Sequence, residues 1–355
     1  MGYPPTTLPF VGALTLLPWR SAVSIYTAGS IALFLVMLFL LAQKSNFLWS
    51  DPRKWYILAF GMALAPLHAG IHECNLSTLV VGLVCLGTIV MRRWPYLSGI
   101  ALAICLCMKP PLAFLFFAYP WVSKRWKAAF AGLATFAAIL AGTTIWMSFH
   151  HVNVFASYRE ALMQFSTGNY YNSVAYPLPD RYLLINIQVM AYQFTHSVLA
   201  SNLLSWAIFL LLAIPTALLI FFRGSEKNEG SALAMLSLLT LMPVFQHTYS
   251  AAMLVFVIYW AIEKWPLKEA QAALLLTSSL LFPLVAMTLR YPPWIRFVEQ
   301  HHLASNFVWN AFLMPYMVWV VLLLAVLVFA DLYRDCARGR CPVSTMPESA
   351  ISAHS

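Results

Sequence analysis

Charged residues are scarce in this chain of 355 residues. Lys, Arg, Asp and Glu make up only 9% of it, whereas apolar residues make up 61%. A soluble domain carries about 25% charged residues, because its surface must face water. This shortage excludes a soluble enzyme, a disordered chain and a fibrous one. The composition therefore predicts an all-α polytopic membrane protein.

Cysteine is also scarce, and its spacing does not suit a metal. The six cysteines form no metal-ligand pattern, and several lie inside apolar runs, where a free thiol behaves as a small hydrophobe. Gly-rich phosphate loops, nucleophile elbows and metal-ligand runs are absent as well. These absences exclude a disulfide framework and a zinc site. The catalytic motifs of soluble enzymes are missing as well.

Apolar stretches long enough for membrane helices follow one another along the chain. A helix needs roughly 20 apolar residues to span a bilayer. Two stretches are interrupted, at Lys109-Pro110-Pro111 and from Pro243 to Ser250, and each half is too short to cross alone. Because irregular backbone at membrane depth is tolerated where it lines a polar cavity, we expect two broken or re-entrant hairpins. Within a single transmembrane domain of residues 1–330, the expected segments are 21–42, 55–70, 75–91, the hairpin 95–122, 126–149, 197–222, the hairpin 231–262, 268–289 and 303–330.

Acidic residues are outnumbered by basic ones, 12 against 21, which gives a net charge of +9. In a soluble protein this excess would suggest a nucleic-acid partner, but in a membrane protein Lys and Arg mark cytoplasmic loops. If both hairpins return to the cytoplasmic side, fifteen of the 21 basic residues fall in loops of that side or in the tail 331–355. We expect this tail to be cytoplasmic and disordered. The charge thus predicts an orientation and no nucleic-acid partner. The membrane that we expect is the inner (plasma) membrane. The loops are 43–54, 92–94, 123–127, 223–230 and 263–268.

Histidines gather on the opposite side of the predicted topology. Eight of the nine fall at or near the extracytoplasmic ends of the predicted segments. The predicted extracytoplasmic loop 150–196 lies there too; it is rich in aromatic and amide residues and contains an amphipathic stretch that we expect to lie on the membrane surface. We therefore expect the functional face to be extracytoplasmic. The eight residues are His68, His72, His150, His151, His196, His247, His301 and His302.

Two groups of polar residues lie unusually deep among the apolar segments. Lys109 interrupts a long apolar run, and an ammonium group in that position suits an anion such as phosphate; the alternative is a lysine that snorkels to the interface. His72 and Glu73 lie near the hydrocarbon boundary, which is costly unless they line a polar cavity. His68 and His72 would share a helix face, but a metal site needs a third ligand and none is evident.

The order of several short motifs resembles glycosyltransferase family 87, a group of membrane transferases with the GT-C fold. The resemblance covers nearly the whole chain, and each motif is short. The segments that carry it are Tyr3-Pro4-Pro5, Gly70 to Ser77 with His72 and Asn75, Gly99 to Lys109-Pro110, Leu184 to Gln188, and Pro243 to Ser250 with His247 and Tyr249.

The resemblance implies an inverting transfer of a hexose, such as mannose, from a polyprenyl-phosphate sugar to an extracytoplasmic glycan or glycolipid acceptor. No nucleotide sugar or other cofactor would be needed. Lys109 would stabilise the departing phosphate, and a carboxylate would act as general base on the acceptor hydroxyl. Glu73 and Asp180 are the candidate catalytic residues. The implied substrate- or phosphate-binding residues are Lys109, His72, Asn75, His247, Tyr249, Arg181 and Tyr3, and no metal ligand is implied.

The chain also departs from the family pattern. Family members carry a further helix and a first outer loop with the catalytic Asp ahead of the Tyr-Pro-Pro segment, at which this chain begins, and Ser250 stands where the family has an acidic residue. We therefore expect a truncated or inactive form. One alternative is a transporter or flippase for a lipid-linked or anionic solute; another is a non-catalytic scaffold. Transporters often contain internal repeats, and the two interrupted stretches share no residue pattern.

Overall fold

Helices dominate the architecture. The computed structural model describes residues 4–153, 156, 159–160, 173–175, 184–223, 228–244, 246–281 and 292–338, and these residues form no β-strand. Four of the described helices are long and apolar enough to cross a membrane. These findings confirm the predicted fold class, an all-α polytopic membrane protein. The four helices are α2 (Trp19–Lys44), α8 (Trp126–Phe149), α11 (Val198–Arg223) and α17 (Tyr316–Arg338).

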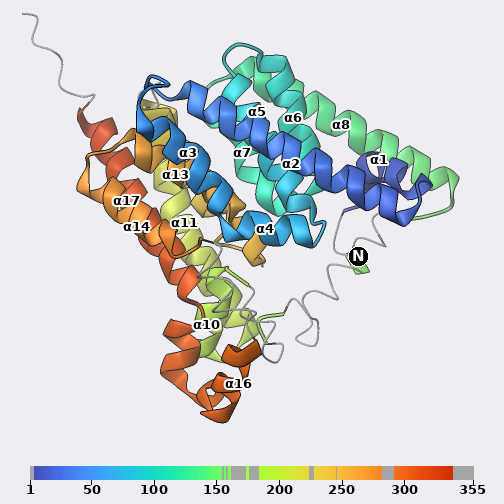
Figure 1. Cartoon of the computed structure of the whole chain (residues 1–355). Coiled ribbons are helices and arrows are strands. Elements are labelled where there is room, and N and C mark those ends of the chain that lie inside the picture. Colours follow the sequence, from blue (N-terminus) through green and yellow to red (C-terminus); the bar gives the residue numbers. More distant parts are fainter. Residues whose placement is uncertain are drawn as a thin grey trace, which may run out of the picture.

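Shorter helices pack between and beside the long ones (Figure 1). The α-helices are α1 (Leu8–Val11), α3 (Pro52–Ala63), α4 (Ala65–His72), α5 (Leu76–Val90), α6 (Pro95–Met108), α7 (Pro110–Val122), α10 (Ile187–Thr195), α12 (Glu229–Thr240), α13 (Val255–Glu263), α14 (Lys268–Ser278) and α16 (Pro292–Gln300). Tighter or wider turns are the 3-10 helices η1 (Pro5–Thr7), η2 (Gly12–Leu16), η5 (Thr248–Leu254) and η6 (Leu303–Ser305), and the π-helix η7 (Trp309–Leu313).

Prolines and capping residues explain where several of these helices begin. Pro52, Pro95 and Pro110 each occupy the first position of a helix, where the missing N–H costs nothing. Asp51 and Asn75 cap α3 and α5, because their side chains accept hydrogen bonds from backbone N–H groups two residues later, at 2.9 and 3.0 Å. The chain is thus divided into short helices by signals that are local in the sequence.

Helices α6 and α7 form a hairpin whose tip is Lys109. The fourteen residues of α6 have a length of about 21 Å, less than the ~30 Å of the hydrocarbon core. Lys109 has φ −148° and ψ 80°, so it is not helical and the chain reverses there. Neither arm of the hairpin can cross a bilayer alone.

The second interrupted stretch consists of α12, η5 and α13 and forms the centre of the bundle. Residues 255–262 of α13 are all buried. The rings of Phe116 on α7 and Phe256 on α13 are stacked, with centroids 5.3 Å apart, so the two interrupted stretches pack against each other.

Helices α6 and α8 are in close backbone contact, since a Cβ atom at Gly99 would overlap the carbonyl oxygen of Ala128.

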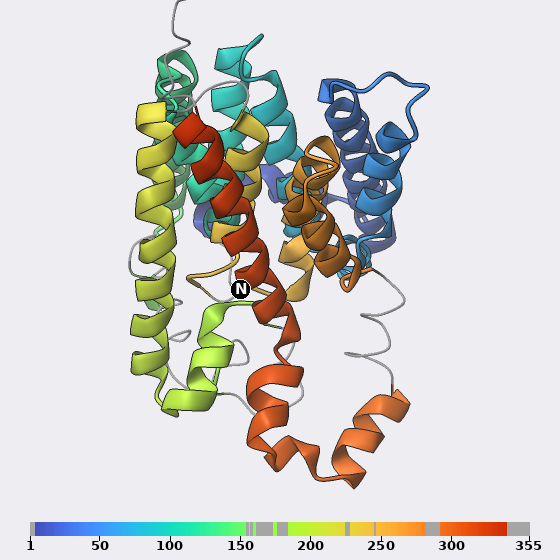
Figure 2. The same cartoon turned by 90° about the vertical axis from the view of Figure 1, so that its left-hand side faces the viewer.

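Three cations from separate loops converge on one carboxylate at the start of α12. The Glu229 side chain is 4% exposed, and its oxygens lie 3.1 Å from Lys44 Nζ, 2.8 Å from Arg92 Nη2 and 2.8 Å from Arg125 Nη2. We call the end of the bundle that carries Lys44, Arg92, Lys124, Arg125 and Glu229 the basic end. Because α6 starts and α7 ends beside these loops, the Lys109 tip points away from it. Figures 1 and 2 show α10 and α16 at the end of the molecule that is opposite the C-terminus of α17.

Candidate functional site

The turn at Lys109 is formed by the two prolines that follow it. A residue before proline is pushed out of the helical region, so α6 ends at Met108 and Lys109 is extended. The backbone N–H of Lys109 still donates to Cys105 O at 2.9 Å, which closes the last turn of α6. The backbone is thus fixed on both sides of Lys109, and this fixes the point from which the lysine side chain extends.

The N-terminal segment braces this turn. Pro111 has no N–H, so it cannot donate to the carbonyl of Cys107 as a helical residue would. The hydroxyl of Thr6 donates to that carbonyl at 2.8 Å, and the hydroxyl of Thr7 lies 3.3 Å from the carbonyls of Cys107 and Met108. Both threonines are buried. A segment about 100 residues away in the sequence therefore satisfies the Cys107 carbonyl, which Pro111 leaves without a donor.

The ammonium group of Lys109 is held by the first turn of α5. It donates to Asn75 Oδ1 at 3.3 Å and to Ser77 Oγ. Asn75 Oδ1 also accepts hydrogen bonds from the backbone N–H of Ser77 at 3.0 Å and from its hydroxyl at 2.7 Å. The hydroxyl of Tyr26 on α2 donates to the backbone oxygen of Asn75 at 2.7 Å. The cap of α5 and the position of the Lys109 ammonium thus depend on the same side chain.

An aromatic pair closes the other side of Lys109. Its Nζ lies 4.7 Å from the centroid of the Tyr249 ring, a cation–π geometry. The His247 ring stacks on Tyr249 with centroids 5.2 Å apart. A Cβ atom at Gly70 would overlap the Thr78 hydroxyl and lie 3.4 Å from Tyr249 Cβ, so α4 reaches this position only with glycine. Lys109, Asn75, Ser77, His247 and Tyr249 are hereafter called the Lys109 cluster.

Two of the motifs that resemble the family pair with each other beside the Lys109 cluster. Leu184 and His247 form an antiparallel bridge, and the N–H of Ile185 donates to Gln246 O at 2.8 Å. The hydroxyl of Ser250 donates to Gln246 Oε1 at 2.8 Å, and both side chains are buried. These contacts fix the backbone that carries His247 and Tyr249.

Within the described part of the chain, the charge of Lys109 has neutral partners. Among the residues that the structure describes, no carboxylate pairs with its ammonium group, whose partners are neutral oxygens and an aromatic ring. A partly buried cation is costly unless a counter-ion or a water-filled space compensates for it. The arrangement therefore suits the binding of an anionic group, and the hydrogen bonds hold the ammonium in place before that group arrives.

The structure brings together some of the predicted site residues and not others. Lys109, Asn75, His247 and Tyr249 meet in the Lys109 cluster. His72 and Glu73 are exposed at the end of α4, whereas the side-chain contacts described for Lys109 are with Asn75, Ser77 and Tyr249. Tyr3, Asp180 and Arg181 lie outside the described residues.

Sequence reasoning missed Ser77, Thr6 and Thr7. A signal existed for Ser77, because an Asn that caps a helix positions the residue two places later beside its side-chain oxygen. For the threonines, the only hint was that a double proline leaves a carbonyl without a donor. Within the described ranges, no three His, Cys, Asp or Glu side chains group as metal ligands; Nε2 of His68 instead lies 2.8 Å from Met62 O.

Comparison with models of known protein families gives a match. The family model for glycosyltransferase family 87 matches residues 2–246, well over half of the chain and a range that includes the Lys109 turn and Asn75. No curated protein matches the chain.

Proposed function

The chain belongs to glycosyltransferase family 87, and from this premise we propose that it transfers a hexose, mannose as the first candidate, from a polyprenyl-phosphate sugar to a glycan or glycolipid acceptor. Family membership and the four apolar helices make the chain a multi-pass membrane glycosyltransferase. The donor, the acceptor and the roles of individual residues are the proposal.

One observation carries it: the ammonium group of Lys109 is partly buried, held by Asn75 and Ser77, and lacks a carboxylate partner among the described residues. A donor of this class carries its negative charge on the phosphate that leaves. As the bond between the anomeric carbon and the phosphate oxygen breaks, its electron pair stays on that oxygen, and negative charge grows there. A fixed cation beside that oxygen lowers the barrier, because it requires no reorganisation when the charge develops.

The remaining roles follow from the same reaction. The acceptor hydroxyl forms the new bond to the anomeric carbon and gives its proton to a carboxylate acting as general base. Glu73 is our candidate among the described acids, since it lies two residues before Asn75 and is exposed at the end of α4; Asp180 is the second candidate. His247, Tyr249 and His72 are proposed to contact sugar hydroxyls or phosphate, together with Arg181 and Tyr3. The reaction as written needs no metal or soluble cofactor.

The proposed orientation follows from the charge distribution. Basic residues of cytoplasmic loops face the side from which the chain is inserted, so the basic end is placed in the cytoplasm and the Lys109 tip toward the extracytoplasmic face. The proposed location is the inner (plasma) membrane, with the C-terminus in the cytoplasm. Accessibility of cysteines introduced near residues 127 and 303 to a membrane-impermeant thiol reagent tests this orientation.

Sugar transfer by the purified full chain in lipid nanodiscs tests the function. Radiolabelled polyprenyl-phosphate-mannose is supplied with a glycolipid extract, and both donor binding and labelled product are measured. Lys109→Met keeps the length of the side chain and removes its charge. We expect the kcat/KM of this variant to fall by about 10²–10³.

Lys54→Met is the matched control. The Lys54 side chain is buried and also lies over an aromatic ring, that of Trp49 at 4.6 Å, but it is on α3 near the basic end. Equal transfer by both variants would overturn the role of Lys109, and donor binding without any transfer would favour a carrier.

A further inference from the structure

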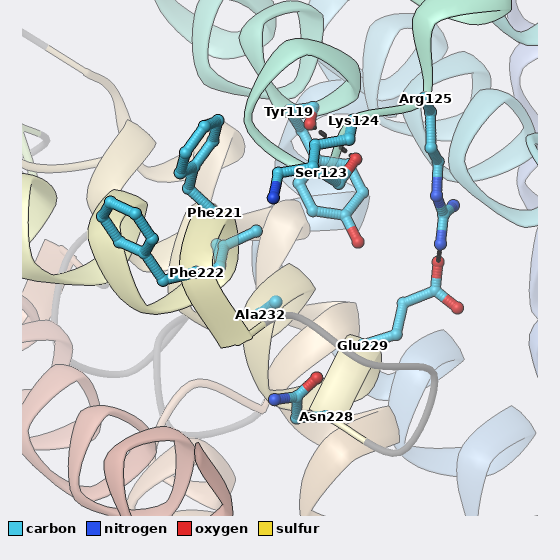
Figure 3. Close-up of a pocket in the computed structure, with 10 residues that line it drawn as sticks. Tyr119, Ser123, Lys124, Arg125, Phe221, Phe222, Asn228, Glu229 and Ala232 are labelled. Atoms are coloured by element: carbon cyan, nitrogen blue, oxygen red, sulfur yellow. Dashed lines mark hydrogen bonds and ion pairs between the residues drawn. The ribbon is translucent and has the colours of Figure 1, made fainter. Parts of the chain in front are cut away.

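A cavity at the basic end has a composition that the transfer reaction does not explain. It has a volume of about 270 Å³, enough for roughly nine water molecules at their liquid volume. The end of α7, the turn 123–125, the last turn of α11 and the first turn of α12 form its walls (Figure 3). It lies at the other end of the α6–α7 hairpin from the Lys109 cluster, so the two sites are separated by the length of α6, about 21 Å.

The polar side of the cavity contains the cation Lys124. Figure 3 shows the Lys124 ammonium directed into the space between Phe221 and Tyr119. Its Nζ lies 4.4 Å from the centroid of the Phe221 ring, and in the described part of the chain it has no carboxylate partner. Glu229, the acid that lines the same cavity, already contacts Lys44, Arg92 and Arg125. Three cations already share the single negative charge of Glu229, so this charge does not also compensate for Lys124.

Arg125 contributes a second donor to the same wall. Arg125 forms an ion pair with Glu229, with Nη2 2.8 Å from Oε1, but its Nη1 is buried and has no hydrogen-bond acceptor among the described residues. A buried donor without an acceptor is destabilising. Tyr119 and Asn228 also line the cavity (Figure 3), but the Asn228 amide already donates to Arg223 O and Cys336 Sγ. The ammonium, guanidinium and hydroxyl groups together match a phosphate, whose oxygens accept several hydrogen bonds at once.

The opposite wall of the cavity is apolar and open to lipid. Phe221 is 40% and Phe222 71% exposed, and both lie in the last turn of α11. Only 22% of the most apolar window of α11 is buried inside the bundle, so most of this helix faces the bilayer. An anion that enters beside Lys124 thus has apolar surface next to it at the level where a membrane helix ends.

We propose that this cavity binds the phosphate of an anionic phospholipid from the leaflet at the basic end, with Lys124 and Arg125 on the phosphate and the acyl chains along Phe221 and Phe222. Basic pockets between membrane helices on the cytoplasmic side are suited to such headgroups. The lipid is preferred over free phosphate because the polar and the apolar wall belong to one cavity. The inference does not rest on the transferase reaction and holds for any activity at the Lys109 cluster.

Native mass spectrometry and thermal unfolding of the full chain in an uncharged detergent test the proposal. The probes are dioleoyl-phosphatidylglycerol, dioleoyl-phosphatidylcholine and inorganic phosphate. We expect phosphatidylglycerol alone to stay bound and to raise the Tm. Lys124→Gln is expected to weaken its binding at least about fivefold, and Lys124→Arg to restore it. Lys127→Gln is the matched control, since Lys127 is also exposed but does not line the cavity.

The outcomes separate the explanations. An equal loss in Lys124→Gln and Lys127→Gln would show a diffuse attraction to the basic surface and overturn the site. Equal retention of phosphatidylcholine would overturn the role of charge. A Tm shift that millimolar inorganic phosphate reproduces in full would assign the cavity to free phosphate and overturn the lipid. Because the readouts are binding and unfolding, they do not depend on whether sugar transfer is observed.

Discussion

The ammonium group of Lys109 lies 3.3 Å from Oδ1 of Asn75, the same atom that caps α5 by accepting a hydrogen bond from the N–H of Ser77. One side chain therefore starts α5 and holds a cation at the tip of the α6–α7 hairpin. This coupling allows the charge of the site to be changed without removing the cap.

Asn75→Asp is the sharpest test of that coupling. Asp caps a helix as well as Asn does, so α5 should keep its first turn. The new carboxylate would pair with Lys109 and cancel the field that attracts a phosphate. We expect the KM for the polyprenyl-phosphate donor to rise at least about tenfold, equivalent to about 1.4 kcal/mol, with little change in Tm. Asn75→Ser is the control, because Ser caps the helix without adding charge; a normal KM in folded Asn75→Asp would refute the phosphate role of Lys109.

The aromatic ring of Tyr249 provides a second prediction. A cation–π contact contributes about 0.5–2 kcal/mol, and Lys109 Nζ lies 4.7 Å from the ring centroid. Tyr249→Phe keeps the ring, so we expect it to retain most of the donor affinity. Tyr249→Leu removes the ring, and its affinity should fall about 2- to 30-fold. Donor titration measures both, and a loss in Tyr249→Phe as large as that in Tyr249→Leu would assign the effect to the hydroxyl instead.

Close packing of α6 on α8 provides a third prediction, which concerns stability. A Cβ atom at Gly99 would overlap the carbonyl oxygen of Ala128, whereas a Cβ atom at Gly142 in α8 would meet nothing within 4 Å. Gly99→Ala should therefore force the two helices apart and cost about 1–3 kcal/mol. Gly142→Ala should leave the Tm unchanged or raise it, because Ala favours a helix more than Gly. Thermal unfolding of the two variants in one detergent compares them, and equal Tm values would contradict this packing.

Local signals made part of this structure predictable. The composition predicts the fold class, and a Lys followed by two prolines inside an apolar run predicts both a break and a polar site at Lys109. The caps at Asp51 and Asn75 follow from the residue types at those positions. These features depend on neighbouring residues, which is why periodicity and propensity are sufficient to find them.

Long-range contacts could not be predicted in the same way. Asn75 and Lys109 are 34 residues apart, and Thr6 lies 101 residues from the carbonyl that it bonds. The basic loops likewise predict an orientation only. The contact between Lys44 and Glu229 could not be predicted from them, because the two residues are 185 positions apart. Such contacts depend on how the hairpins pack, and no property of the single segments encodes that packing.

The Glu229 contacts give a final prediction, for the pH dependence of stability. Burial alone would raise the pKa of Glu229, but Lys44, Arg125 and Arg92 outweigh it and hold the pKa below its ordinary value of 4.5. The unfolded chain therefore takes up this proton at a higher pH than the folded chain does. The stabilisation is complete above about pH 4.5 and is lost as the pH falls through the folded-state pKa. We expect the Tm of the wild type in uncharged detergent without phosphate to fall in this acidic range.

Glu229→Gln isolates this contribution. Removing one partner of a buried ion pair costs about 3–5 kcal/mol, so the variant should unfold at a lower Tm at pH 7. Because Gln does not titrate, the gap between wild type and variant should shrink as the pH falls below 4.5. Glu263 lies close by, and burial and the charge of Glu229 both raise its pKa, so its titration differs between the two proteins. The comparison is therefore repeated in a Glu263→Gln background, where Glu263 cannot titrate. A gap that stays constant from pH 7 to pH 3.5 would mean that Glu229 stabilises the bundle by packing rather than by its charge.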